Sequence, residues 1–205
     1  GAGTIAGAAT WTLLTLMGPV IRGVREALSV THRSSGDETD RDLPPRLIMG
    51  LGIILVAILA GLFTVFLWPV IPHDSAMLVA VLLGITACVA LGFLVAAACG
   101  YMAGIVGSSS SPISGISIVA IVILGVTILG LEQLHWLPEA FSADQQRVAM
   151  AFALYVLTAL TASAAISNDN LQDLKTGQLI GATPWRQEVA LLIGCVVGAI
   201  GIPPV

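Results

Sequence analysis

The residues of this sequence that are equipped for chemistry lie in two short polar stretches between long apolar runs. The first is GSSSSPISG, residues 107–115, and the second is SNDNLQDLK, residues 167–175. Hydroxyls and amides can bind a polar molecule, and we predict substrate contacts from Ser108, Ser109, Ser110, Ser111, Ser114, Asn168 and Asn170. Charged groups can carry a proton or hold the cationic part of a substrate, and we predict ion coupling through Asp169, Asp173 and Lys175.

The serine run predicts a break between two helices. Serine hydroxyls can satisfy backbone groups that leave a helix, and Pro112 suits the first turn of a new helix because it has no N–H. Ser111 is then the expected N-cap. Within lipid, irregular backbone is tolerated only where protein covers it or water reaches it. The run therefore either lines a cavity, where the positive helix end favours a carboxylate, or forms a short solvated surface loop, and the spacing leaves both open.

The second stretch continues the polar side of the apolar run at residues 148–167. Two helical faces carry these polar groups, with Thr158, Thr161 and Asn168 on one face and Ser163, Ser167 and Asn170 on the other. Hydroxyls in such a run can also bond back to the preceding turn, and Asp173 with Lys175 can form an ordinary surface pair. We expect the glycines and the proline of residues 177–184 to break the next helix.

Composition places these stretches in a membrane protein. Hydrophobic residues make up 57% of the 205 residues and charged residues 10%, against about 45–50% and about 25% in a soluble domain. A helix needs about 20 apolar residues to cross a bilayer. We predict an all-α helical bundle of about six spans or partial spans, at residues 1–20, 47–71, 76–106, 113–134, 148–167 and from 189 onward. The chain begins inside one apolar run and ends inside another. We therefore expect a fragment of a larger multi-pass protein, without its own signal peptide.

The distribution of Lys and Arg predicts the orientation of the spans. Five arginines lie in the charged segment at residues 21–46, and Lys175 and Arg186 lie in the polar segment at residues 168–188. By the positive-inside rule both segments face the cytoplasm, the second as a surface or re-entrant segment. The connection at residues 107–112 then falls on the same side, yet it carries no basic residue.

Small side chains recur at every fourth position of the run at residues 76–106. Such a row lets a neighbouring helix approach backbone to backbone. The row consists of Gly84, Cys88, Gly92, Ala96, Gly100, Gly104 and Ser108. Helix packing explains it without any further function.

Together these segments resemble a known family. GYMAGIVGSSSSPISGISI and SAAISNDNLQDLKTGQLIGATPWRQE are similar to the oligopeptide transporter (OPT) family, which includes the yellow stripe-like carriers of metal chelates. The resemblance covers essentially the whole chain, and QDLKTG followed by GATPWRQ carries it most specifically. It implies a secondary active transporter of the inner membrane, a proton symporter for short peptides or metal chelates, of which this chain is a C-terminal part. The implied partners are the small-molecule substrate, protons and the lipid bilayer, with a homo-oligomer as a further option.

Other functional classes have less support. The three cysteines lie in apolar runs without CxxC or Cys/His spacing, so we predict no metal site, disulfide or cofactor. A membrane hydrolase needs a base within the bilayer, whereas His32, His73 and His135 lie in connections, so we predict no enzyme. Nothing in the composition points to nucleic acid. A channel or a non-transporting membrane scaffold is the alternative, because serine-lined segments also form pores.

Overall fold

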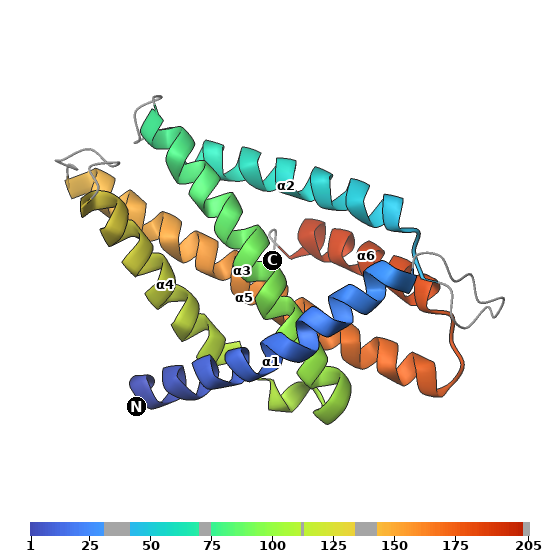
Figure 1. The fold of residues 1–205 in the computed structure, drawn as a ribbon. Coiled ribbons are helices and arrows are strands. Elements are labelled where there is room, and N and C mark those ends of the chain that lie inside the picture. Colours follow the sequence, from blue (N-terminus) through green and yellow to red (C-terminus); the bar gives the residue numbers. More distant parts are fainter. Residues whose placement is uncertain (31–41, 70–74, 112, 134–142, 203–205) are drawn as a thin grey trace.

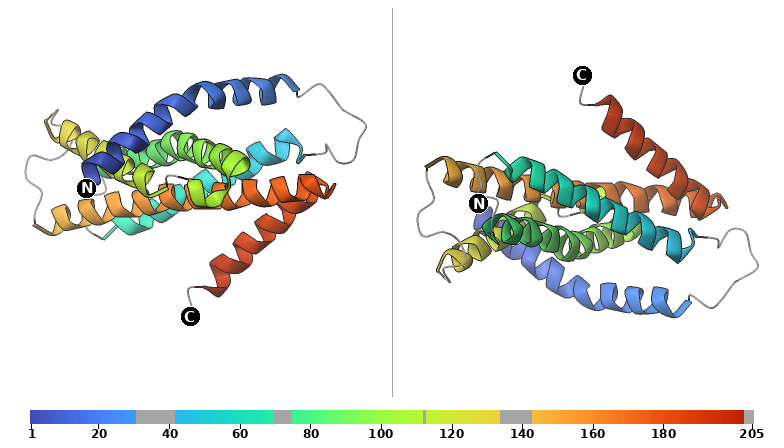
Figure 2. Two further views of the ribbon diagram at one scale, coloured as in Figure 1. Left: turned by 90° about the horizontal axis from the view of Figure 1, so that it is seen from below. Right: turned by 90° about the horizontal axis from the view of Figure 1, so that it is seen from above.

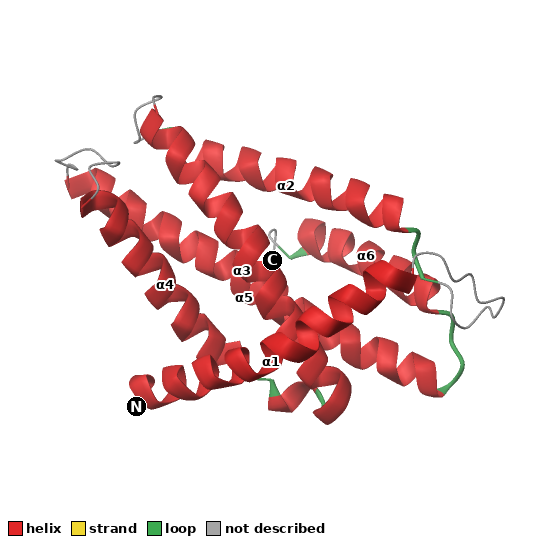
Figure 3. Ribbon diagram, viewed as in Figure 1, coloured by secondary structure: helices red, strands yellow, loops and turns green. Residues whose placement is uncertain are grey.

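The chain folds into helices joined by short connections. We describe it from a computed structural model, in which the described residues are 1–30, 42–69, 75–111, 113–133 and 143–202 (Figure 1). In chain order the elements are α1 (Ala2–Val30), α2 (Pro45–Leu67), α3 (Ser75–Val106), the 3₁₀ turn η2 (Ser108–Ser110), α4 (Ile113–Gln133), α5 (Ala143–Leu179) and α6 (Pro184–Gly201). These ranges contain no strand, so the all-α prediction is confirmed (Figure 3).

Proline and glycine mark several helix ends. Pro45 and Pro184 occupy the first turns of α2 and α6, where the missing N–H breaks no helical bond. Gly181, between α5 and α6, has a φ of 72°, a conformation that glycine adopts without the clash of a Cβ atom. The sharp reversal between the last two helices therefore depends on a residue without a side chain.

α3 and α5 make the most extensive contact between described helices. The small side chains of α3 face α5 there. A Cβ atom added at Gly84 would come within 2.8 Å of Phe152, and one added at Gly100 within 2.7 Å of the Ser167 hydroxyl. A Cβ atom at Gly104, near the end of the row, would meet nothing within 4 Å. The row is thus a helix-packing surface over most of its length, as its spacing predicts.

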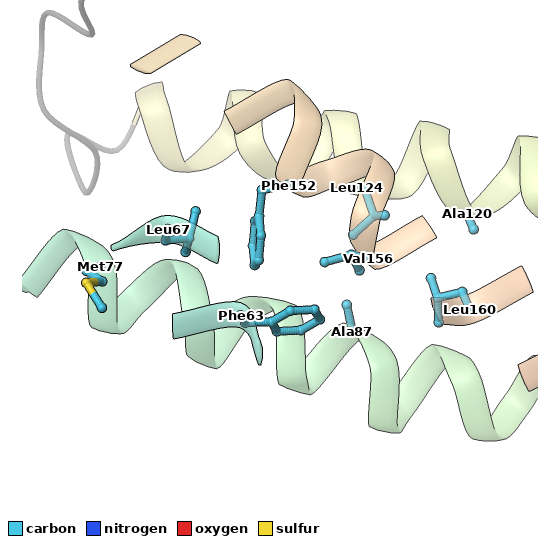
Figure 4. Packing of buried hydrophobic residues seen from close by; sticks show 9 residues of the cluster. All are labelled: Phe63, Leu67, Met77, Ala87, Ala120, Leu124, Phe152, Val156 and Leu160. Atoms are coloured by element: carbon cyan, nitrogen blue, oxygen red, sulfur yellow. The ribbon is translucent and has the colours of Figure 1, made fainter. Parts of the chain in front are cut away.

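Large apolar side chains fill the space between α2, α3, α4 and α5. Phe63 is fully buried and packs edge-on against Phe152, with ring centroids 5.0 Å apart. Figure 4 shows the cluster, whose buried members are Phe63, Leu67, Met77, Ala87, Ala120, Leu124, Phe152, Val156 and Leu160. A smaller cluster lies toward the end of α3 and consists of Val95, Cys99, Ile116 and Ala164. These clusters fix α5 against α3 and α4.

The outward faces of the helices are apolar. Helices at Pro45–Leu67, Met77–Val106, Ile113–Gly130 and Gln146–Leu179 are long and apolar enough to cross a membrane, and at most 28% of each apolar window is buried inside the described part. A surface of this kind needs lipid or further helices around it. The prediction of a polytopic membrane bundle is therefore confirmed.

The helices around this core are arranged on both sides of α3, which lies between α1 and α5, while α6 diverges from α5 (Figure 2). α1 crosses the beginning of α4 closely, because Gly115 has no side chain there. A Cβ atom added at Gly115 would lie 2.7 Å from the Cβ atom of Ala9.

Some helix boundaries differ from those the sequence predicts. α1 continues to Val30, so the first part of the predicted loop at residues 21–46 is helical. α5 continues to Leu179, so most of the polar segment at residues 168–188 is also helical, and its glycine at position 177 does not break the helix. Apolar runs predict where a helix crosses the membrane, not where the helix ends. Backbone hydrogen bonds can continue the helix into polar sequence outside the membrane, where its side chains reach water. Residues 31–41, with His32, lie outside the described residues, as do His73 and His135.

Candidate functional site

The predicted serine site is at the break between α3 and α4. Gly107 ends α3 with a φ of 106°, and its N–H donates to the Ala103 carbonyl at 3.0 Å. The serines of η2 follow, and the Ser111 N–H donates to the Ser108 carbonyl at 3.3 Å. The chain reverses from α3 into α4 within this short segment (Figure 1).

Asn168 of α5 connects both ends of this break. It is only 4% exposed. The Ser111 hydroxyl shares its one proton between Asn168 Oδ1 and the Cys99 carbonyl of α3, the latter at 3.3 Å. Asn168 Nδ2 donates to the Ser108 carbonyl and to the Asp169 carboxylate, each at 3.4 Å. This orientation of the amide follows from the chemistry, because a carbonyl and an ionised carboxylate only accept hydrogen bonds. The structure therefore brings the predicted residues Ser108, Ser111 and Asn168 together.

The other residues of the break have different surroundings. Ser109 and Ser114 are exposed, whereas the side chain of Ser110 and the whole of Pro112 lie outside the described residues. The sequence predicts the Ser111 hydroxyl as the N-cap of α4, and this stays a prediction; the structure shows where the hydroxyl donates, to acceptors on α3 and α5.

The three predicted charged residues all lie on α5 but are not brought together. Asp169 is exposed beside Asn168. Lys175 is also exposed, and its ammonium donates to Gln178 at 2.8 Å along the same helix. Asp173 instead lines a groove shared with α6. The predicted polar stretch thus serves two separate places, the break between α3 and α4 and the groove beside α6.

The groove between α5 and α6 has a volume of about 890 Å³. Asn170 and Asp173 line it from α5, and Gln187, Ala190 and Gly194 are among the residues that line it from α6. The two helices separate from their turn toward the end of α6 (Figure 2). The groove therefore has polar groups at the end near the turn and is apolar farther along α6.

Gln187 is a groove residue that the sequence analysis did not single out. Its Nε2 atom is buried and has no hydrogen-bond partner within the described residues. The amide lies where a side chain at Gly177 would be, because an added Cβ atom there would overlap its terminal atoms. A polar residue ahead of the apolar run from residue 189 was visible in the sequence, but only the turn between α5 and α6 brings it onto Gly177.

Two further polar contacts join α5 to its neighbours. The hydroxyls of Ser117 on α4 and Thr161 lie 3.0 Å apart, and each also reaches, at 2.9 Å, the carbonyl one turn earlier in its own helix. Ser167 donates to the Ala96 carbonyl of α3 at 2.7 Å. Thr158 donates to the carbonyl one turn earlier in its own helix, at 2.8 Å. The polar groups of α5 therefore include both interhelical bonds and ordinary local ones.

Glu188 connects α6 to the segment that precedes α2. The Leu43 N–H donates to its carboxylate at 3.3 Å. Burial raises the pKa of Glu188, the hydrogen bond from Leu43 lowers it, and the negative charge of Asp42 raises it. Because Glu188 precedes the apolar run of α6, this contact lies at the polar end of that helix.

The binding groups of the described part are hydroxyls, amides and carboxylates. Within the described ranges no group of three or more His, Cys, Asp or Glu side chains is placed to hold a metal ion. Cys88, Cys99 and Cys195 are free thiols.

Comparison with known proteins gives two matches over the whole chain. The family described as OPT oligopeptide transporter protein matches residues 1–205. A protein of Haemophilus influenzae named "Putative oligopeptide transporter" is 44% identical over 210 residues, which cover 100% of this chain and 32% of that protein. The chain therefore spans about a third of the length of this relative. No solved structure matches the chain.

Proposed function

This chain belongs to the OPT oligopeptide transporter family, and from this premise we propose that it forms part of a proton-coupled carrier of short peptides or metal chelates. The carrier works in the inner membrane, and the lipid bilayer, the small-molecule substrate and protons are its partners. The chain contributes a helical bundle with one polar break to the transport path. A homo-oligomeric assembly is compatible with this role, since most apolar helix surface is exposed.

The observation that carries the proposal is the buried hydrogen-bond network at the α3–α4 break. A long apolar bundle has no structural need for unwound serine backbone, which must be satisfied wherever lipid excludes water. Asn168 satisfies part of it through Ser108 and Ser111, and this leaves the hydroxyls of Ser109 and Ser114 exposed. We assign the exposed hydroxyls at the break, and Asn170 in the groove beside α6, to substrate contact. The hydrogen bonds among Ser108, Ser111 and Asn168 hold the break in position.

Asp169 is the residue to which we assign proton coupling. Its carboxylate accepts a hydrogen bond from Asn168 Nδ2, which also donates to the Ser108 carbonyl. When Asp169 takes up a proton it loses its charge and becomes a weaker acceptor. Protonation therefore weakens the bond that Asn168 Nδ2 donates to Asp169, and through this shared amide it changes how firmly α5 holds the break. Lys175 has no part in this scheme, because it donates to Gln178 on the exposed side of the helix.

A channel is the competing function, because exposed serine hydroxyls at a helix break also suit a pore. A carrier and a channel differ in how solute flux depends on substrate concentration and on the proton gradient. A carrier saturates with substrate and couples its uptake to a gradient, whereas a channel passes solute down its own gradient only.

The test is uptake into proteoliposomes that contain the full-length parent protein. Labelled short peptides and ferric chelates are offered separately, with and without an inward proton gradient. Saturable uptake that needs the gradient is expected for at least one class. Uptake without saturation would establish a channel, and no uptake of either class by folded protein would reject transport.

Variants then test the assigned roles. Asp169→Asn should leave substrate uptake possible but remove its dependence on the proton gradient. Ser111→Leu removes the hydroxyl that donates to Asn168, so it should reduce uptake more than it reduces membrane insertion. Equal losses of uptake and insertion in Ser111→Leu would reject the role of the break.

A further inference from the structure

One face of α6 lines the groove beside α5. Ala190, Gly194 and Gly198 recur on it at every fourth position, and Leu191, Cys195 and Ala199 follow each of them. Residues four apart lie on the same side of a helix, so these six positions form one continuous surface. No residue of α6 is buried within the part of the chain that the structure describes, because α6 leaves α5 beyond their turn (Figure 2). This surface is therefore open along the helix.

The small residues of this face repeat the pattern that packs α3 against α5. On α3, the missing side chain of Gly100 leaves room for Ser167. On α6, a Cβ atom added at Gly194 would meet nothing within 4 Å, and one added at Gly198 would meet only Ile202, four positions along, at 3.7 Å. Glycine within a helix is less favourable than alanine, and in membranes it is enriched where a second helix approaches closely. The row on α6 therefore matches a contact with a helix outside the described residues.

The end of the groove near the turn carries one negative charge. Asn170 and Asp173 line it from α5, and Asp173 is the one carboxylate among the described residues of the lining. No described residue forms an ion pair or a hydrogen bond with that carboxylate. An occupant that is apolar over most of its length and cationic at this end complements the groove. Membrane spans have this composition, since Lys and Arg are enriched at their cytoplasmic ends, the side predicted for residues 168–188.

We propose that a transmembrane helix from the remainder of the full-length protein lies in this groove. The match covers 32% of the Haemophilus influenzae relative, so about two thirds of that protein lie outside it. A helix of the same polypeptide is held near the groove at a high effective concentration. It places small side chains against Gly194 and Gly198, and a Lys or Arg at its cytoplasmic end pairs with Asp173. The helix also closes the groove in front of Asn170, on the α5 side, where the proposed function places substrate contact.

A second copy of this chain would complement the groove less well. In a two-fold dimer the same surface lies on both sides of the interface. Two such surfaces together add a second carboxylate and no cation, because no Lys, Arg or His of the described ranges lines the groove. Like charges at an interface repel each other. Lipid acyl chains likewise match the apolar part of the groove but leave the charge of Asp173 unpaired.

Photo-crosslinking of the full-length protein in proteoliposomes tests the inference. p-Benzoylphenylalanine replaces Cys195, which lines the groove, and mass spectrometry identifies what it joins after irradiation. The expected product is a crosslink within one polypeptide to an apolar segment outside residues 1–205 that has a Lys or Arg at one end. A crosslink to a second copy, to lipid or to this chain's own helices alone, or no crosslink at all, would overturn the inference.

Ile193 is the matched control position on the same helix. It is 60% exposed and lies two positions from Cys195, about 200° around the helix, so it faces away from the groove. p-Benzoylphenylalanine at this position should not reach the segment that is found from Cys195. If both positions give the same crosslink in equal yield, that segment does not lie in the groove, and the inference is wrong.

Substitutions in the groove then test the contact, with the crosslinker kept at Cys195. Gly194→Leu obstructs the close approach of the second helix, so it should lower the crosslink yield at least about fivefold, whereas Ile193→Leu should leave the yield unchanged. Asp173→Lys should also lower the yield, and exchange of the paired Lys or Arg for Asp should restore it. An unchanged yield in Gly194→Leu would overturn the contact, and absence of the rescue would overturn the pairing with Asp173. The crosslink does not require transport, so a failure of all uptake would overturn the proposed function alone.

Discussion

Replacement of Asn168 with alanine tests whether one buried amide holds the α3–α4 break. The variant loses the acceptor for the Ser111 hydroxyl and the donor to the Ser108 carbonyl. The Ser111 hydroxyl keeps the Cys99 carbonyl as its partner, so it is not left unsatisfied. The Ser108 carbonyl loses the bond that ties it to α5.

The expected cost follows from these two bonds. Interhelical hydrogen bonds within membranes contribute about 0.6 kcal/mol each on average, so two of them contribute about 1.2 kcal/mol. The space left by the truncated side chain, which is 4% exposed in the native protein, adds a packing loss of similar size. We therefore expect Asn168→Ala to lower the free energy of unfolding by about 2.4 kcal/mol, a factor of about 50 in the unfolding equilibrium.

The assay is reversible unfolding of the full-length protein in mixed micelles with increasing dodecyl sulfate. Thr158→Ala is the control, since this hydroxyl bonds only within α5 and its loss should change stability by less than about 0.5 kcal/mol. A double-mutant cycle with Ser111→Ala should give a coupling of about 0.5–1 kcal/mol with Asn168→Ala. The reasoning is refuted if Asn168→Ala is as stable as Thr158→Ala, or if the coupling is zero.

Three further predictions use the same unfolding measurement. Gly100→Ala should lower the free energy of unfolding by about 1–3 kcal/mol, because its Cβ atom would lie 2.7 Å from a hydroxyl on α5. Gly104→Ala should be nearly neutral, since its Cβ atom would meet nothing within 4 Å. Equal effects of the two variants would contradict the packing account. Ser117→Ala combined with Thr161→Val should show coupling of about 0.5 kcal/mol, because the two hydroxyls lie 3.0 Å apart, and strictly additive effects would exclude that bond. The raised pKa of Glu188 means that the folded state binds the proton of this carboxyl group more tightly than the unfolded state does. Protonated Glu188 therefore stabilises the fold below its ordinary pKa of about 4.5, and this stabilisation is lost as pH rises through the raised value. Glu188→Gln should flatten the dependence of the unfolding free energy on pH, and an unchanged slope would assign that dependence to other groups.

Much of the fold is predictable from residue types and their spacing. Four of the predicted apolar runs correspond to helices long and apolar enough to cross a membrane. The row of small residues predicts a close helix contact, and the Gly84–Phe152 and Gly100–Ser167 approaches between α3 and α5 confirm it. The break after Val106 also lies where the serines and proline predict it. The ends of α1 and α5 were misjudged, because helices continue past the apolar runs that mark them.

Hydropathy, small-residue spacing and proline are local properties, so the sequence by itself determines that the chain is a helical membrane bundle with a polar break. The hydrogen-bond partner of each polar side chain is not determined by such local properties. Asn168 and Asn170 are two positions apart, about 200° around a helix, and only packing decided that one meets the break while the other faces α6. Gln187 reaches Gly177 only because the turn at Gly181 folds α6 back onto α5. The side-chain partners depend on how helices distant in sequence pack together, and no local pattern encodes that arrangement.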